Sequence, residues 1–581
     1  VQSAAALARA LLVRNPGNAE LDKWLASAER AAAAGNETHA ESPALRMELA
    51  FTRGVAALLR GDFAACAMGI DALRTAAAGY DALPVVILEA SQQLAVGAGE
   101  AALRMAQQAL AAAESEGVRG CDTWLRAIVA AAALGAGQRD RARGELQLLE
   151  AAGGRVCRGD RAVQRSLRAW LAALDGDAAG ALREAKAAAE TALEAGLPWL
   201  ECVARAGLGR LLADAGDRRA CEAQMRSAES IAERVPSALL RFCVQLAAAE
   251  AALSLGEEAA ALVALKAAFA LGREHGFRQA PWWRSRGVAD LCALALQHGV
   301  EREYVRALVR EQNLVPQAPP LRIRDWPWPF RIRTFGGFQL LRGNTPVEFG
   351  GKGPGRPLEL LKVLVSLGAA NVRSDQLADA LWPHAEADFA HKSFTAALHR
   401  LRRLFGDEDT LTLRDGRLSL NPALVWLDLW ALEQVLGELD DALRLPNAER
   451  AAPVARAVAS EALSLYRGPF LPDESEQPAY IASREHVRAR LLRSISRLAR
   501  QREEAGQRDA AAECYLQLID ADDLFEAPYR YLMQCLQRSG EASEARGAYE
   551  RLRTVLSTKL RMMPSAETQA VYASLGPPAA A

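Results

Sequence analysis

The sequence has few of the features that mark metal-binding and catalytic proteins. Its nine cysteines are scattered, with no Cys-x-x-Cys pair and no histidine at metal-ligand spacing. This pattern is typical of reduced, mostly buried thiols, and it predicts neither a disulfide framework nor a metal site. No grouping of His, Asp and Ser, of Cys and His, or of two acids stands out from the background. We therefore expect a protein that is not an enzyme and holds no cofactor.

Long apolar runs and a large net charge are also missing. No stretch approaches about 18 apolar residues without a charge, and the start lacks a basic and apolar leader. The sequence therefore predicts a cytoplasmic protein that does not associate with a membrane. The 581 residues carry a formal charge of −1, so an affinity for nucleic acid requires a local concentration of basic side chains. This length predicts several domains rather than one core.

Proline and β-branched residues are scarce between residues 43 and 312, where Ala and Leu dominate and favour amphipathic helices. Glycines recur there every 38 to 40 residues, each with an acidic residue within the next three positions. We expect each glycine to end one helix in the left-handed conformation and the acid to cap the next helix. The spacing predicts a tetratricopeptide-like solenoid over 43–315. The glycines are Gly61, Gly99, Gly137, Gly176, Gly216 and Gly256.

Tryptophans recur along this array, at Trp124, Trp170, Trp199, Trp282 and Trp283. Two interpretations remain open. The rings could line a groove for a ligand, or they could pack between helices, which is the commoner place for a tryptophan. We expect the array to sense a small-molecule or protein effector.

The stretch before the array, residues 1–42, is predicted to form one more helical pair, with a break from Gly35 to Pro43. The chain begins at Val1 already within a helical pattern. We therefore expect it to be a piece of a longer protein.

Proline returns in the stretch 316–329, where it forbids a continued helix and predicts an extended linker. After residue 421 a helical pattern resumes and continues to the end. Gly506 and Gly540 lie 34 residues apart, which is the length of a tetratricopeptide unit. The sequence thus predicts a second, smaller block of helical repeats over 422–581, and the fold class is mainly α.

The segment 330–421 combines strand and helix patterns. It predicts a β-hairpin, three helices and a second β-hairpin. Asp415-Gly416 is the strongest two-residue signal for the second turn, and Ser374 is the expected cap of the second helix. The expected elements are a hairpin over 330–349 that turns at Gly343-Asn344, helices over Pro357–Gly368, Ser374–Trp382 and Asp388–Phe405, and a hairpin over 411–420.

The third of these helices has an apolar face and a cationic face. Phe394, Leu398, Leu401 and Phe405 share the apolar side, and no carboxylate occurs between Asp388 and Asp407. A face that is cationic along its length, with small residues between the charges, can enter a major groove. The opposite side carries Lys392, Ala396, His399 and Arg403, flanked by Thr395 and Arg402 and by Ser393 and Arg400.

The second hairpin places Arg414 and Arg417 at the tip of a β-wing, within reach of a flanking backbone or minor groove. Residues 321–421 contain fifteen Lys and Arg against eleven Asp and Glu, a local charge of +4. An isolated cluster of arginines is usually a solvated surface. A cationic helix that follows a short helix and a turn, and precedes such a wing, favours DNA binding instead.

Four motifs in this segment resemble the OmpR/PhoB-type winged helix, a two-component effector domain that also occurs in SARP-type activators. They are Ile332-Arg-Thr-Phe-Gly-Gly-Phe-Gln-Leu340, Arg356-Pro-Leu-Glu-Leu-Leu361, Leu381-Trp-Pro383 and Leu398-His-Arg-Leu-Arg-Arg403. The remainder resembles the bacterial transcriptional activator domain in Tyr466-Arg-Gly-Pro-Phe-Leu471, Arg484-Glu485, Phe525-Glu-Ala-Pro-Tyr-Arg530 and Pro564. The resemblance covers about 330–575. By period and composition, the solenoid resembles the sensor region of MalT-like regulators of the STAND type.

The resemblance implies which residues meet DNA. The third helix would read the major groove through Lys392, Thr395, Ala396, His399 and Arg403, with Ser393, Arg400 and Arg402 placed for phosphates. Relatives often carry an NTPase upstream, but this chain has no G-x-x-x-x-G-K-[ST] motif. The glycine-rich stretch Gly350–Gly355 precedes the first winged-helix helix, and we expect it to form a loop near DNA with Lys352 beside the backbone.

Two functions remain open at this point. The first is a sequence-specific regulator of transcription that binds double-stranded DNA and whose C-terminal repeats contact RNA polymerase; two copies on repeated half-sites are one arrangement. The second is an interaction scaffold in which the repeats bind peptides and the winged helix binds protein.

Overall fold

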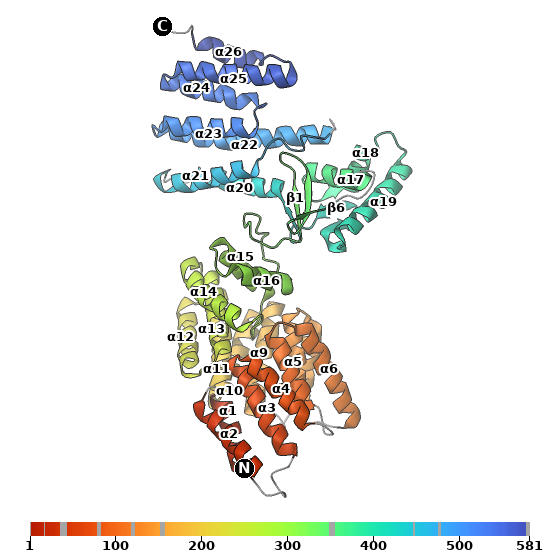
Figure 1. Ribbon diagram of the computed structural model, residues 1–581, viewed down its shortest axis with the longest axis vertical. Coiled ribbons are helices and arrows are strands. Elements are labelled where there is room, and N and C mark those ends of the chain that lie inside the picture. Colours follow the sequence, from red (N-terminus) through yellow and green to blue (C-terminus); the bar gives the residue numbers. More distant parts are fainter. Residues whose placement is uncertain are drawn as a thin grey trace. The chain divides into compact units, whose positions relative to one another are not determined.

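The computed structural model describes residues 2–16, 18–34, 43–77, 83–117, 122–151, 157–347, 355–444, 448–474 and 478–576. The chain divides into two compact units, residues 1–318 and 319–581 (Figure 1). The predicted class, mainly α with tetratricopeptide-like repeats around a small β-containing region, is confirmed.

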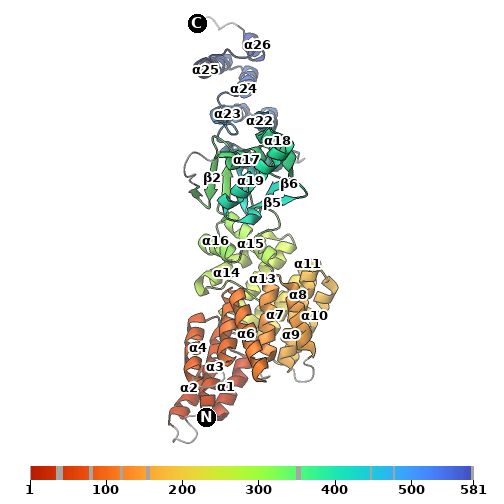
Figure 2. The same ribbon diagram turned by 90° about the vertical axis from the view of Figure 1, so that its right-hand side faces the viewer.

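The first unit is a stack of helices in which neighbours along the chain pack side by side (Figures 1 and 2). Its helices are α1 (Gln2–Arg14), α2 (Ala19–Ala34), α3 (Pro43–Arg60), α4 (Phe63–Ala76), α5 (Leu83–Ala95), α6 (Gly99–Glu116), α7 (Asp122–Gly135), α8 (Arg139–Ala151), α9 (Arg158–Asp175), α10 (Ala178–Glu194), α11 (Pro198–Asp214), α12 (Arg218–Arg234), α13 (Ala238–Ser254), α14 (Glu258–His275), α15 (Ser285–Gln297) and α16 (Arg302–Glu311).

The predicted left-handed glycine is confirmed at five of the six turns and the predicted acid cap at three. Gly61, Gly137, Gly176, Gly216 and Gly256 all have positive φ. The carboxylates that follow three of them accept a backbone N–H and cap the next helix, in Asp62, Asp177 and Asp217.

The second repeat turn differs from the prediction. Gly97, with a φ of 85°, takes the left-handed position, and Gly99 is already the first residue of α6. The prediction for Gly99 was wrong because two glycines lie in this turn and the earlier one ends the helix. In addition, Glu257 makes no side-chain cap, although it precedes α14.

The helical pair at the start shares its core with the array. Ala5, Leu21 and Leu25 are buried in one cluster with Leu49 and Leu58 of α3. Helices α1 and α2 therefore extend the stack. The predicted break from Gly35 to Pro43 lies outside the described residues, apart from Pro43, which begins α3.

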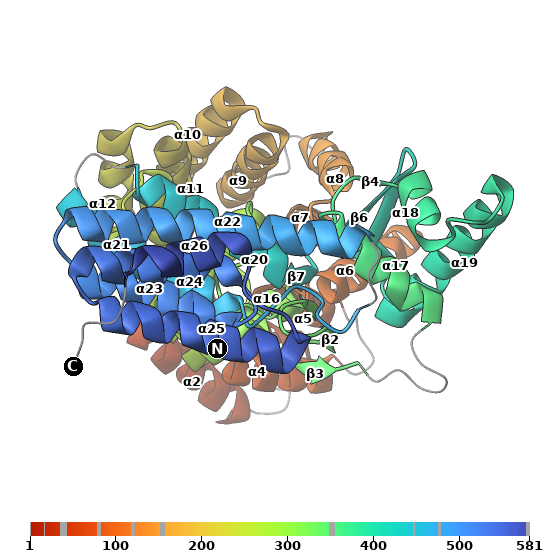
Figure 3. The ribbon, with the colours of Figure 1, turned by 90° about the horizontal axis from the view of Figure 1, so that it is seen from above.

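The second unit contains two small sheets and ten helices within its described ranges (Figure 3). The strands are β1 (Phe330–Arg333), β2 (Gln339–Arg342), β3 (Thr345–Pro346), β4 (Val372–Arg373), β5 (Leu411–Arg414), β6 (Arg417–Leu420) and β7 (Val425–Leu427). The helices are α17 (Gly355–Ser366), α18 (Ser374–Leu381), α19 (Ala387–Phe405), α20 (Asp428–Ala442), α21 (Ala448–Leu465), α22 (Pro478–Glu504), α23 (Arg508–Ala521), α24 (Glu526–Ser539), α25 (Ala542–Leu560) and α26 (Ala566–Ser574), with a short 3-10 turn η2 (Glu408–Thr410).

The hairpin predicted over 330–349 has an additional turn, because the stretch before Gly343 forms two strands instead of one. Strand β1 ends at Arg333 and β2 begins at Gln339, and they pair antiparallel. Gly336 and Gly337, with φ of 73° and 136°, turn the chain between them. The turn at Gly343 then leads into the two-residue strand β3, and the expected end of this hairpin, Phe349, lies outside the described residues.

The two sheets have the strand orders β3-β2-β1-β7 and β4-β6-β5. Strand β7 pairs parallel with β1, with Phe330 opposite Val425. Since β7 follows the predicted domain end at residue 421, the first sheet spans that boundary. A single hydrophobic core runs from Phe330 to Leu575. The winged helix and the C-terminal helices therefore form one packed body.

The proline-rich stretch also packs on this body. Trp326 and Trp328 are buried, at 3% and 2% exposed. The Trp426 Nε1 donates to the Leu321 carbonyl at 2.8 Å, and Arg322 pairs with Glu438 and Glu461. From residue 319 onward, this stretch is therefore part of the second unit.

Candidate nucleic-acid interface

Three helices of the second unit form a helix-turn-helix. Helices α17, α18 and α19 pack against one another (Figure 2). The segment 382–386 joins α18 to α19, and Pro383 prevents α18 from continuing. Arg356 donates to the carbonyl of Leu381 at 3.1 Å and lies over the Trp382 ring at 5.7 Å. Ser374 is the first residue of α18 and not its cap, because Arg373 takes the cap position.

Helix α19 buries one side and exposes the other, as its sequence predicts. Six apolar side chains are buried: Ala390, Phe394, Ala397, Leu398, Leu401 and Phe405. Lys392, Thr395, Ala396, His399, Arg400 and Arg403 are exposed. Gly406, with a φ of 72°, ends the helix. The helix lies at the edge of the second unit (Figure 3).

The cations of this exposed face are not neutralised within the part of the chain that the structure describes. Lys392, Arg400, Arg403 and His399 form no ion pair there. Thr395 donates its hydroxyl hydrogen to the carbonyl of His391 at 3.0 Å, so its hydroxyl oxygen can still accept hydrogen bonds. An exposed, unpaired cationic helix of this kind matches the polyanionic backbone of a nucleic acid.

Two residues of the predicted set differ from the rest. Ser393 is half-buried. Arg402 is half-buried too, and its guanidinium donates to the carbonyl of Leu411 at 3.3 and 3.0 Å. Arg402 therefore ties α19 to the first strand of the wing. Its predicted phosphate contact stays a prediction.

The wing is a tight hairpin of β5 and β6. Asp415 and Gly416 both have positive φ, 49° and 69°, as a two-residue turn of this hand requires. The amide of Ser374 donates to the Gly416 carbonyl at 2.8 Å and fixes the tip to the start of α18. Arg414 is exposed and makes no ion pair within the described ranges, whereas Arg417 donates to the carbonyl of Asn371 at 3.1 Å. The Arg417 side chain is thus held by a backbone carbonyl, whereas the Arg414 side chain is not.

One exposed residue of α19 was missed by the sequence reasoning. Phe389 is 61% exposed and precedes Lys392 by one turn and Ala396 by two, on the same side of the helix. Its spacing from Lys392 is the signal that could have identified it, but as an apolar residue near a helix start it resembled core. An exposed phenyl ring can contact a thymine methyl group. Lys352, by contrast, lies outside the described residues.

A buried carboxylate joins the first sheet of this unit to the C-terminal helices. Asp428, at the start of α20, accepts hydrogen bonds from the amide and hydroxyl of Thr334, at 2.6 and 2.7 Å, and from the amide of Phe335 at 3.1 Å. Burial raises the pKa of Asp428 to about 6, although these three donors oppose the shift.

Further contacts join the same two parts. The Phe335 ring packs against Tyr466 and Phe470, with ring centroids 5.3 and 6.1 Å apart. Lys362 of α17 pairs with Glu474. The orientation of the helix-turn-helix is therefore set by contacts with the C-terminal helices.

The described ranges were searched for a metal site and for a helix that could cross a membrane. No cluster of three or more His, Cys, Asp or Glu there could hold a metal ion. No helix there is both long and apolar enough to cross a membrane.

Residues 427–575 match the family model of the bacterial transcriptional activator domain. The comparison with curated proteins found no match. Among solved structures, the chain is similar to EmbR of Mycobacterium tuberculosis in complex with a low-affinity phosphopeptide, with 22% identity and a TM-score of 0.30. That match covers 42% of this chain and 65% of EmbR, so the chain spans less than two thirds of that relative.

Two other solved structures share helical repeats with the chain. The Rap protein complexed with competence and sporulation factor is 12% identical, with a TM-score of 0.36 and coverage of 78% of this chain and 99% of that one. The tetratricopeptide domain of P58(IPK) is 12% identical, with a TM-score of 0.23 and coverage of 91% and 97%. At such TM-scores, these likenesses add nothing to the argument on function.

The small sheets and helices α17–α19 thus share one core with the helices that follow, and residues 427–575 of this unit match the bacterial transcriptional activator domain. The predicted resemblance to SARP-type activators with tetratricopeptide-like repeats is thereby confirmed. The families found are regulatory rather than enzymatic.

Proposed function

We propose that this chain binds specific sequences in double-stranded DNA and activates transcription in the cytoplasm, with α19 as the recognition helix. The observation that carries the proposal is the exposed cationic face of α19, which forms no ion pair with the described residues and lies opposite a buried apolar face. A helix with one such face, presented at the edge of a packed body, fits the major groove.

The contacts divide by chemistry. Lys392, His399 and Arg403 are placed for base edges, where Arg and Lys favour guanine. Thr395, Ala396 and Phe389 offer apolar groups to thymine methyls. Arg400, Ser393, Arg402 and Lys352 are proposed to contact phosphates.

The two arginines of the wing are expected to contribute unequally to salt-dependent binding. Each phosphate contact that is lost lowers the slope of log affinity against log salt by about 1 unit. We expect Arg414→Ala to give most of that change, because Arg414 is exposed and unpaired, and Arg417→Ala to give less, because Arg417 is bonded to Asn371. Mobility shifts at four salt concentrations measure both. An unchanged slope in the double variant would mean that the wing points away from DNA.

The helical repeats take the other roles of an activator. The C-terminal pairs α20–α26 would contact RNA polymerase, and the first unit would sense an effector. Two copies of the chain on repeated half-sites would read a longer operator.

The second unit is expected to bind its operator without the first. Residues 319–581 have one core of their own, and Trp326 and Trp328 are buried in that unit, so a fragment should start at 319. We expect this fragment to fold alone and to bind with the affinity of the full chain, with regulation by an effector lost. If the first unit instead holds the reader inactive, removing it raises the affinity.

The test is a selection of bound sequences from a random DNA library, followed by mobility shifts of the full chain and the fragment side by side. Enrichment of one motif by both proteins supports the proposal. A fragment that is folded by circular dichroism and binds no DNA even at low salt contradicts it and favours the interaction scaffold, in which the winged helix binds protein.

A further inference from the structure

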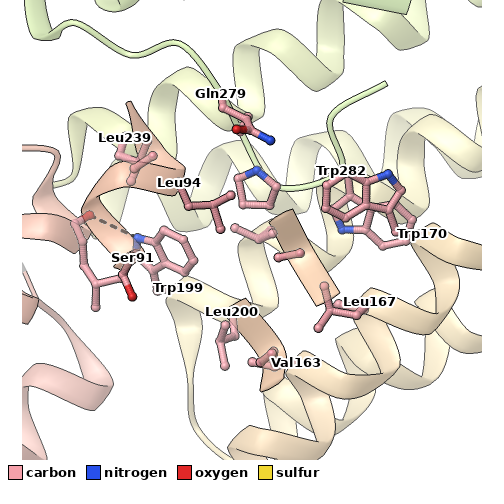
Figure 4. A pocket seen from close by; sticks show the side chains of 18 of the residues that line it. Ser91, Leu94, Val163, Leu167, Trp170, Trp199, Leu200, Leu239, Gln279 and Trp282 are labelled. Carbon is pink, nitrogen blue, oxygen red and sulfur yellow. Dashed lines mark hydrogen bonds between the residues drawn. The ribbon is translucent and has the colours of Figure 1, made fainter. Parts of the chain in front are cut away.

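The inside of the first unit contains a cavity of about 260 Å³ (Figure 4). Its walls come from the first helix of six successive pairs, α3, α5, α7, α9, α11 and α13, so it lies on the inner side of the stack. The connection between α14 and α15 supplies the remaining wall, with Gln279, Ala280, Pro281 and Trp282. A site at which six repeats converge is formed by the whole array.

The α14–α15 connection is anchored on both sides of the cavity. At one end, Phe277 packs against Phe63 and Phe242, with ring centroids 5.4 and 5.3 Å apart. At the other, Gly207 of α11 leaves the room that the Trp282 ring fills, since a Cβ there would lie 2.5 Å from the ring. Gly135 of α7 gives room to Gln279 in the same way. The wall is therefore held in place without an occupant.

The Trp282 ring is also supported from behind. Arg210 lies 5.8 Å from its centroid and donates to Glu250 at 3.0 Å. Burial lowers the pKa of Arg210 to about 10, so it keeps its charge at neutral pH. Trp282 itself has a φ of 66°, which a bulky residue rarely adopts and which surrounding structure must hold.

The lining is apolar and aromatic, and no charged side chain contributes to it. Trp170, Trp199 and Trp282 all contribute to the lining, with Ser91 and Leu239 among the other lining residues (Figure 4). The Trp199 Nε1 donates a hydrogen bond to the carbonyl of Leu59, at 3.3 Å. An uncharged lining disfavours a charged occupant, which would lose its hydration without compensation.

One donor in this lining has no partner. Trp170 is 4% exposed, and its buried Nε1 makes no hydrogen bond within the described part of the chain. Buried indole N–H groups usually have a hydrogen-bond partner, and a buried donor without one costs about 1–3 kcal/mol of stability. The side-chain amide of Gln279, 7% exposed, also makes no hydrogen bond there. Both groups belong to the wall of one apolar cavity, so an occupant with an acceptor would satisfy them.

We infer that this cavity binds a small, uncharged, mainly aromatic molecule that carries a hydrogen-bond acceptor for the Trp170 N–H. A cavity of about 150 Å³ holds benzene, so one of about 260 Å³ holds a molecule of two or three aromatic rings. The inference rests on the proposed function in one respect, which is that the bound molecule is the effector of a DNA-binding regulator. The binding of that molecule to the cavity does not depend on DNA.

The first test uses the fluorescent probe N-phenyl-1-naphthylamine and the full chain without DNA. We expect one probe per chain and at least about tenfold weaker binding of 8-anilinonaphthalene-1-sulfonate, which has the same rings and a charge. Ala131→Phe on α7 fills the cavity and should abolish binding. Ala223→Phe, at an exposed alanine of α12, is the matched control and should bind as the parent does.

The second test asks whether Trp170 selects an acceptor. By competition with the probe, 2-acetylnaphthalene should bind about tenfold more tightly than 2-isopropylnaphthalene, which has the same shape without the carbonyl. In Trp170→Phe that preference should disappear while probe binding remains. This comparison also carries the inference if circular dichroism shows that Ala131→Phe does not fold.

Three results would overturn the inference. They are no probe binding, equal binding of the charged probe, and a ketone preference that survives in Trp170→Phe. None of these measurements involves DNA, so a chain that binds the probe and no operator keeps this inference and loses the proposed DNA reader.

Discussion

Asp428→Ala is expected to lower the free energy of unfolding of residues 319–581 by about 3–5 kcal/mol, since it leaves buried donors unpaired at about 1–3 kcal/mol each. The amides of Thr334 and Phe335 and the Thr334 hydroxyl all donate to this carboxylate. Urea unfolding followed by circular dichroism measures the change.

The matched control is Asp428→Asn. Its side-chain oxygen can still accept from the two amides, and its NH2 group can donate a hydrogen bond to the Thr334 hydroxyl oxygen. We expect it to lose about 1 kcal/mol or less. If the two variants lose the same free energy, the charge and not the hydrogen bonds fixes the sheet to α20.

The same pair of proteins should differ in pH dependence. Because burial raises the pKa of Asp428 to about 6, the folded state holds the proton more tightly than the unfolded chain. The stability that this proton contributes is present at low pH and is lost as the pH rises from about 4 through about 6. The parent fragment should thus lose stability over that window relative to Asp428→Asn. Parallel pH profiles would show that Asp428 keeps an ordinary pKa.

Arg403→Ala is expected to weaken binding to the selected operator by about 1–3 kcal/mol, which is roughly fivefold to 150-fold, and to weaken nonspecific binding less. The reason is that Arg403 is exposed on the same side of α19 as Lys392 and has no ion pair in the described ranges. Phe389→Ala should also reduce specific affinity without a loss of stability, because its ring is 61% exposed.

Arg456→Ala on α21 is the matched control, since Arg456 is exposed and lies outside the proposed interface. Competition of operator and random DNA in mobility shifts separates the two kinds of binding. An equal loss for every sequence would make Arg403 a phosphate contact and would remove the proposed base readout.

Helix α19 could be predicted from the sequence because its determinants are local. Phe394, Leu398, Leu401 and Phe405 repeat at helical spacing, and Gly406 ends the helix, so both the bounds and the exposed face follow from the period. The Asp415-Gly416 turn was likewise predicted, since its geometry depends on two adjacent residues.

Contacts between distant segments could not be predicted in this way. The parallel pairing of β1 with β7 joins residues about 95 positions apart, and periodicity says nothing of it. In the sequence, Asp428 resembles any acid at a helix start, and Arg402 and Arg417 resemble Arg403 and Arg414. Only the fold shows that Arg402 and Arg417 donate hydrogen bonds to backbone carbonyls. Whether the residues of the exposed face contact DNA stays a prediction.

The core shared by the winged helix and α20–α26 has a consequence for promoter architecture. Under the proposed function, α19 cannot turn in its groove without carrying the C-terminal helices with it. The face of the double helix on which those helices stand is then set by the operator's position, and B-DNA repeats that face about every 10.5 base pairs. The protein would impose a phase, as well as a distance, between its operator and the promoter it serves.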